Sequence, residues 1–256
     1  MRRSLKLLLV LLFYLFNAWL VVSFSRTAGI FTYPLIIAAS LFFILALKLK
    51  VPRNGLLEGG LFAAISMGIV LNGLLLLGAI TVGPIRDNFS SYLLTGVVVQ
   101  LLVSFGEELG FRAAIFQALD DELGMWPAAI LSAAGFAALH LPSMGIVGLG
   151  RQSDLIALAT IFFAGIVLAL LYKYGGIFNA ISFHFIWNYI EYDLFNMGPL
   201  EGAINVSKPG PEILTGGAFG PEASILTMAI MALLIVVVWL FYNKFRKPKG
   251  TQNLSP

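Results

Sequence analysis

The sequence predicts an all-α fold, a polytopic membrane bundle of about eight transmembrane helices around a polar cavity inside the membrane. Composition is the first reason, because 59% of the 256 residues are hydrophobic and only 11% are charged. A soluble domain carries about 25% charged residues, so this chain has too few charges to cover its surface in water. The second reason is the length of its apolar runs, since a helix needs about 20 residues to cross a bilayer.

Eight apolar runs are long enough, or nearly long enough, to cross a membrane as helices. They are expected at residues 6–24, 30–49, 56–82, 92–118, 125–141, 154–173, 176–195 and 223–243. The fifth run is short and contains Trp126-Pro127, so we expect it to begin at the interface or to be partly re-entrant. Segment 196–222 is rich in glycine and proline, which predicts an external loop that shapes access to a cavity. Residues 1–256 are expected to form a single integral membrane domain.

The distribution of basic residues predicts the orientation of this bundle. They gather near both ends of the chain and after the second apolar run: Arg2, Arg3, Lys6, Lys48, Lys50, Arg53, Lys244, Arg246, Lys247 and Lys249. The opposite loops carry only Arg26, Arg86, Arg151 and Lys208. The positive-inside rule therefore places both termini in the cytoplasm, in a multi-pass protein of the cell membrane. The chain has no cysteine, which excludes disulfides, thiolate catalysis and a cysteine metal site.

Two adjacent glutamates, Glu107 and Glu108, lie inside the fourth apolar run. An acidic side chain at the centre of a bilayer costs about 2.5–3.5 kcal/mol on insertion scales, so a functional site in the membrane is expected there. On a helix, Glu108 precedes Arg112 by four residues, the order that favours an ion pair. Gln100 and Ser104 share this face, which must point into the bundle. Glu107 has no basic residue within one helical turn and is the candidate general base.

The only two histidines of the chain, His140 and His184, also lie in apolar runs. His140 follows Phe136 by four residues, and His184 precedes Asn188 by four, so each pair shares one face of a helix. Glu107 with His140 could activate a water molecule. His184 and Asn188 could donate hydrogen bonds to the oxyanion of a tetrahedral intermediate. The residues therefore predict a hydrolytic site.

Taken together, these patterns resemble the three motifs of the CPBP family, which comprises the CAAX prenyl proteases of the Ras-converting type and the bacteriocin-processing or Abi proteins. The matching motifs are Glu107-Glu108-x-x-x-Arg112, Phe136-x-x-x-His140 and His184-x-x-x-Asn188, within a core of residues 90–195. The resemblance implies an intramembrane glutamic endopeptidase with an eight-helix core and no metal or other cofactor. It implies that Glu107 and His140 activate water and that His184 and Asn188 stabilise the oxyanion. Glu108 and Arg112 would support the site.

Other interpretations of the same residues stay open. His140, His184 and a glutamate match the His₂Glu ligand set of a hydrolytic zinc site, although the chain lacks the H-E-x-x-H pattern. Buried glutamate, histidine and arginine also occur in proton-coupled carriers, and the fold could serve a non-catalytic immunity protein or scaffold. The expected partners are the lipid bilayer and a protein or peptide substrate, including membrane-associated or lipidated ones. No nucleic acid is expected.

Overall fold

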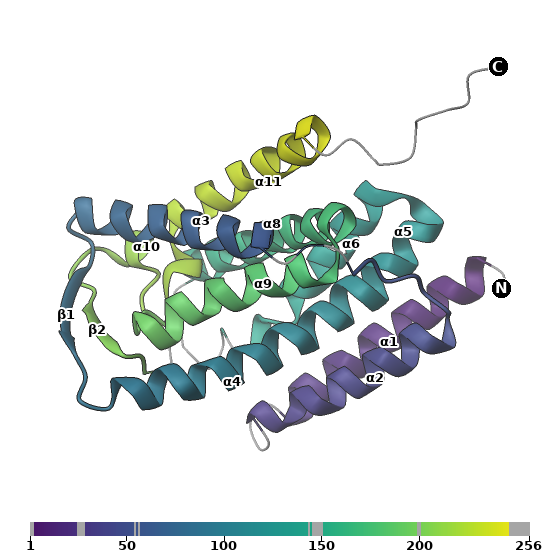
Figure 1. The fold of residues 1–256 in the computed structure, drawn as a ribbon, viewed down its shortest axis with the longest axis horizontal. Coiled ribbons are helices and arrows are strands. Elements are labelled where there is room, and N and C mark those ends of the chain that lie inside the picture. Colours follow the sequence, from purple (N-terminus) through teal and green to yellow (C-terminus); the bar gives the residue numbers. More distant parts are fainter. Residues whose placement is uncertain are drawn as a thin grey trace.

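The computed structural model describes residues 3–24, 29–53, 55, 57–142, 144, 151–198 and 201–245. Most of these residues are helical, which confirms the predicted all-α class (Figure 1). Among them, six helices are long and apolar enough to cross a membrane: Arg3–Phe24, Gly29–Ala46, Glu58–Leu76, Phe89–Leu123, Gln152–Gly175 and Ile225–Phe245. Five of the predicted basic residues, Arg2, Arg26, Arg246, Lys247 and Lys249, lie outside the described residues.

Each of the eight predicted runs contains a helix. The helices are α1 (Arg3–Phe24), α2 (Thr32–Ala46), α3 (Leu57–Leu76), α4 (Phe89–Glu108) with α5 (Gln117–Leu123), α6 (Met125–Ala138), α8 (Arg151–Gly175), α9 (Ile177–Asn188) and α11 (Ile225–Phe245). The fifth run is short, as expected, because α6 has only 14 residues. A four-residue helix, α10 (Glu212–Thr215), lies in the loop before α11.

The predicted end of the third run at residue 82 is wrong, because α3 stops at Leu76. Gly78 has a φ of +63°, a conformation that ends an α-helix. Residues Thr81–Ile85 then form strand β1, which pairs antiparallel with β2 (Ile204–Ser207). The pairing is irregular between Val82 and Ile85, where Pro84 has no N–H group to donate. The glycine-rich loop is therefore tied to the α3–α4 connection by a small sheet.

Two helices that carry motif residues continue as π-helices. Helix α4 ends at Glu108 and passes without a break into the π-helical segment Leu109–Phe116. Helix α9 ends at Asn188 and passes into the π-helical segment Tyr189–Leu194. π-Helical turns are rare and occur frequently at functional sites. Both segments begin directly after the polar residues that the sequence singles out.

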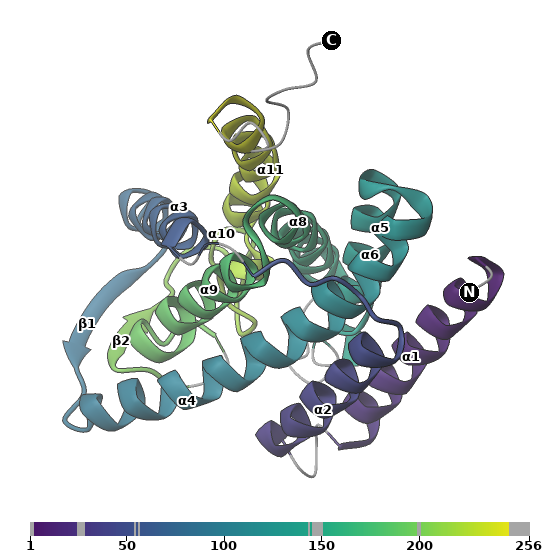
Figure 2. The same ribbon diagram turned by 45° about the vertical axis from the view of Figure 1, so that its right-hand side comes forward.

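Helix α8 lies at the centre of the bundle, where it packs against α6, α9 and α11 (Figure 2). Small residues allow the close approach: a Cβ atom on Gly165 of α8 would lie 2.8 Å from the Cβ of Ala133 on α6. Helix α9 packs against α3, and the side chain of Asn179 fixes this contact. Its Oδ1 accepts the Gly59 N–H at 2.9 Å, and its Nδ2 donates to Glu58 at 3.1 Å. Helix α9 is thereby held between α3, α4 and α8.

Candidate active site

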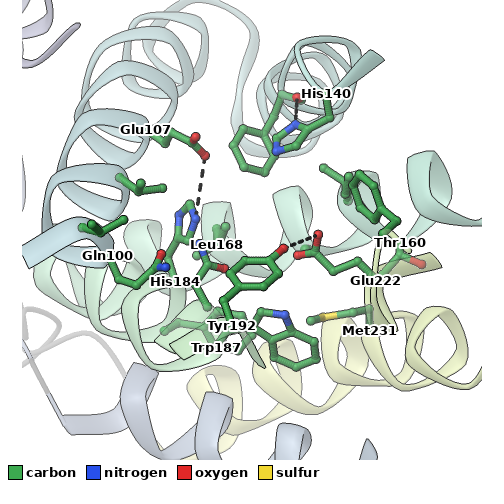
Figure 3. Close-up of a pocket in the computed structure, with 18 of the residues that line it drawn as sticks. Gln100, Glu107, His140, Thr160, Leu168, His184, Trp187, Tyr192, Glu222 and Met231 are labelled. Carbon is green, nitrogen blue, oxygen red and sulfur yellow. Dashed lines mark hydrogen bonds and ion pairs between the residues drawn. The ribbon is translucent and has the colours of Figure 1, made fainter. Parts of the chain in front are cut away.

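The four residues predicted to be catalytic line one cavity of about 490 Å³ (Figure 3). Glu107 reaches it from the last turn of α4, and His140 from the turn that follows α6. His184 and Asn188 both come from α9. Residues from three different helices therefore meet, as expected from the three motifs. The remaining walls are largely apolar and come from α2, α4, α6, α8, α9 with its π-helical continuation, α11 and the loop before α11.

Glu108 and Arg112 form the predicted ion pair behind the cavity. Arg112 Nε lies 3.3 Å from Glu108 Oε2, and both side chains are fully buried. The guanidinium also lies 4.5 Å from the centre of the Phe136 ring and donates from Nη2 to the Gly165 carbonyl at 3.4 Å. Gln100 and Ser104, on the same face, are also buried. The polar stripe of α4 thus points into the bundle, as its spacing predicts.

His184 lies between the two glutamates. Its Nδ1 is 2.8 Å from Glu108 Oε1, which is a hydrogen bond, and its Nε2 is 3.7 Å from Glu107 Oε2, which is too long for one. Since an ionised carboxylate can only accept a hydrogen bond, Nδ1 of His184 carries the proton. Nε2 is the ring nitrogen that faces Glu107. Sequence spacing assigned Glu108 to Arg112 alone. No pattern within one helix could have indicated its second partner on α9.

The orientation of His140 is set by Phe136, one turn earlier. His140 Nδ1 lies 2.9 Å from the Phe136 carbonyl oxygen, so Nδ1 donates its proton there. The two rings meet edge to face with centroids 5.0 Å apart. Phe136 also contacts the ring of His184 at 6.2 Å, so one aromatic side chain separates the two histidines. In its neutral form His140 therefore keeps Nε2 as a proton acceptor.

Tyr33 is a site residue that the sequence analysis missed. Its hydroxyl donates to Glu107 Oε1 at 2.9 Å, from the first turn of α2. Gly106 allows this approach, because a Cβ there would lie 2.7 Å from Cδ1 of Tyr33. The hydrogen bond fixes one oxygen of the Glu107 carboxylate. Tyr33 lies in an apolar helix far from the motifs, so no pattern in the sequence predicts its contact with Glu107.

A second cavity, of about 580 Å³, lies on the other side of the same residues. It is enclosed by α1, α2, the α4 continuation and α6, and its other walls are mostly apolar. The two cavities share four lining residues: Tyr33, Glu107, Phe136 and His140. The Glu107 side chain keeps 18% of its surface exposed, between these two spaces.

The glycine-rich loop adds a second acidic group to the first cavity, besides Glu107. Glu222 comes from the 3₁₀ turn Pro221–Ala223 and accepts a hydrogen bond from the Tyr192 hydroxyl at 3.4 Å. Burial raises the pKa of the Glu222 carboxyl, while the charges of His140 and His184 oppose that rise. The glycine and proline content of this loop predicted that it shapes access to a cavity, and no pattern in its sequence singled out Glu222.

The ligand set of a zinc site is not assembled in the part of the chain that the structure describes. There, no three histidine, aspartate or glutamate side chains lie together in a way that could hold a metal ion. Glu108, the carboxylate hydrogen-bonded to His184, is already engaged by Arg112.

Comparison with known families agrees with the geometry. Residues 89–190 match the family of type II CAAX prenyl endopeptidases, Rce1-like. The match begins with α4 and ends just after α9, so it contains all seven residues of the three motifs, whereas Tyr33 and Glu222 lie outside it. No curated protein matches the chain. The match confirms the resemblance to the CPBP family: at residues 89–190 the chain carries the Rce1-like domain of the type II CAAX prenyl endopeptidases, a family of membrane proteases.

Proposed function

We propose that the protein is a metal-independent intramembrane endopeptidase of the glutamic type, which hydrolyses a peptide bond in a membrane-associated or lipidated protein. The observation that best supports this activity is the convergence of Glu107, His140, His184 and Asn188 on one cavity, in a bundle whose long helices are apolar enough to cross a membrane. The whole chain, residues 1–256, would act as one membrane domain. Each residue has an environment that suits a separate step.

Glu107 and His140 activate the water molecule. The Tyr33 hydroxyl holds Glu107 Oε1, and Glu107 Oε2 and His140 Nε2 are the acceptors that take the proton. As the water loses a proton to this pair, its oxygen bonds to the carbonyl carbon of the substrate and the carbonyl electrons move to the oxygen. When the intermediate collapses, the C–N bond breaks and the same proton passes to the departing amine.

His184 and Asn188 stabilise the oxyanion. Because Nδ1 of His184 is bound to Glu108, the ring can donate from Nε2 only as an imidazolium. The Glu108 carboxylate favours that charged form, and Arg112 holds the carboxylate in place. The Asn188 carboxamide supplies the second donor. Donors fixed in advance around a developing negative charge are the largest contribution to catalysis in many hydrolases.

Asn188→Ala is expected to lower kcat by about 10²–10³-fold, the usual effect of losing one oxyanion donor. Residual activity should remain, because His184 still donates. The rate can be measured on purified protein in proteoliposomes, with Asn72→Ala on the exposed face of α3 as the control. A wild-type rate in Asn188→Ala would remove this residue from the mechanism.

The proposed activity itself is tested by comparing membrane proteomes of cells that produce the wild-type protein or Glu107→Gln. Proteins that accumulate uncleaved only with the variant are substrates, and their absence would contradict a protease. Cleavage of such a substrate in vitro should survive EDTA and phenanthroline. Loss of activity with either chelator, and its return with added zinc, would favour the zinc mechanism instead.

The orientation of the bundle follows the basic side chains. The start of α1, the end of α2 and the end of α11 lie toward one end of the molecule, and the β1–β2 sheet lies at the other (Figure 1). Lys6, Lys48 and Lys244 belong to or adjoin these helix ends in the sequence. By the positive-inside rule, we place both termini in the cytoplasm of a cell membrane and the sheet outside. Tags on the termini that only permeabilised cells expose to antibody would support this orientation.

A further inference from the structure

Glu222 lies across the cavity from Glu107, as Figure 3 shows. Its backbone is held firmly, because the Ala223 N–H donates to the Gly220 carbonyl at 2.9 Å and the Ser224 N–H to the Pro221 carbonyl at 2.8 Å. Gly220 has a φ of +105°, which only glycine adopts easily. The turn therefore presents Glu222 to the cavity in a fixed position.

No lysine or arginine among the described residues forms an ion pair with Glu222. The nearest basic residue of its own loop, Lys208, is otherwise engaged: its Nζ donates to the carbonyls of Met197 at 2.5 Å and Gly217 at 2.7 Å. Tyr192 gives Glu222 a neutral hydrogen bond only. A buried acidic group that has no lysine or arginine partner inside an apolar bundle is costly and commonly marks a functional site. Here the site faces the space that a substrate would occupy.

The surroundings of Glu222 suit a long basic side chain. Trp187, Phe219 and Met231 line the same cavity and provide apolar surface for the methylene stem of a lysine or arginine. The rings of Trp187 and Phe219 can also attract a cation. Of the other acidic side chains at the site, Glu108 is paired with Arg112, and Glu107 accepts a hydrogen bond from Tyr33.

Building on the proposed peptidase activity, we propose that Glu222 binds a lysine or arginine side chain of the substrate, close to the peptide bond that is cleaved. The residue lies outside segment 89–190 that matches the protease family, so this preference belongs to the loop before α11 and not to the shared motifs. The cavity would then admit an otherwise apolar segment that carries one basic residue at a defined distance from the cleavage site.

The test uses the full-length protein in proteoliposomes and quenched-fluorescence peptides with an apolar sequence. In each set of peptides, a single position carries lysine, glutamine or glutamate, and the varied position differs from one set to the next. At the position that faces Glu222, the wild-type protein should cleave the lysine peptide with a kcat/KM about 30-fold above that of the glutamine peptide, as expected for a close buried charge pair. Most of the difference should lie in KM. Glu222→Gln should bring this ratio close to one.

The matched control is Glu201→Gln, in the same loop, where the glutamate is 69% exposed and pairs with Arg86 away from the cavity. It should keep the wild-type lysine preference. A wild-type protein that cleaves without preferring lysine would overturn the inference and leave the peptidase proposal standing, even if Glu222→Gln failed to fold. An equal fall in kcat on all peptides in Glu222→Gln would overturn it in favour of a proton-transfer role. If no peptide were cleaved, both proposals would fail.

Discussion

Replacing Glu107 by glutamine is expected to lower kcat by about 10²–10⁴-fold, the contribution typical of a positioned general base. Glutamine keeps the shape of the side chain, and its carbonyl can still accept the Tyr33 hydroxyl. It cannot take a proton from water. The variant should therefore insert, fold and bind substrate like the wild-type protein, and fail only in the chemical step.

The measurement is single-turnover cleavage of a substrate by purified protein, together with its thermal stability in detergent. Glu122→Gln is a suitable control, because this glutamate lies on α5 and pairs with Lys6, away from both cavities. His140→Ala and His184→Ala should lose activity to a similar degree. If Glu107→Gln cleaved at the wild-type rate, Glu107 would not be the base and the assignment of the whole site would have to change.

The second large effect is expected from Arg112→Ala, which should destabilise the protein by about 3–5 kcal/mol, because it leaves a buried charge without its partner. Both side chains of the pair have 0% exposure, so water cannot replace the guanidinium. The Phe136 ring also loses the cation that lies over it at 4.5 Å. The loss should appear in reversible unfolding in detergent micelles, and activity should fall because Glu108 no longer holds His184 in one orientation.

A double variant separates the charge from the packing. Glu108→Gln with Arg112→Met removes both charges and keeps similar volumes, and such replacements are often neutral in stability. It should recover most of the stability lost in Arg112→Ala, while activity stays low. Equal stability of Arg112→Ala and the wild-type protein would show that the ion pair contributes little to the fold.

The sequence predicted those features that depend on one helix at a time. Hydropathy alone located the long apolar helices, because a run of about 20 apolar residues matches the thickness of the hydrocarbon core of a bilayer. The pairs Glu108–Arg112 and Phe136–His140 were predicted correctly, since residues four apart on a helix must be neighbours. The hydrogen bond from His184 to Glu108 could not be predicted, because it depends on how α9 packs against α4.

The features that the sequence did not predict depend mostly on contacts between segments that are far apart in the chain. Strands β1 and β2 are far apart in sequence, and the apolar run before β1 concealed the turn at Gly78. The π-helical segments leave no clear pattern of their own. Tyr33 and Glu222 enter the site from segments outside the motifs, and a single tyrosine or loop glutamate has no distinguishing neighbours in sequence. Packing between distant segments, and not local preference, placed them there.

For the proposed peptidase, the two cavities that share Glu107 and His140 bear on how water and substrate reach a site inside the bilayer. The proposed reaction consumes water, which the bilayer excludes, and a polypeptide that is held in or at the bilayer. With a single approach, a bound polypeptide would itself block the next water molecule. Because the Glu107 carboxylate borders both cavities, the substrate polypeptide can bind in one of them while water enters through the other. In this proposal the two reactants need not bind in a fixed order.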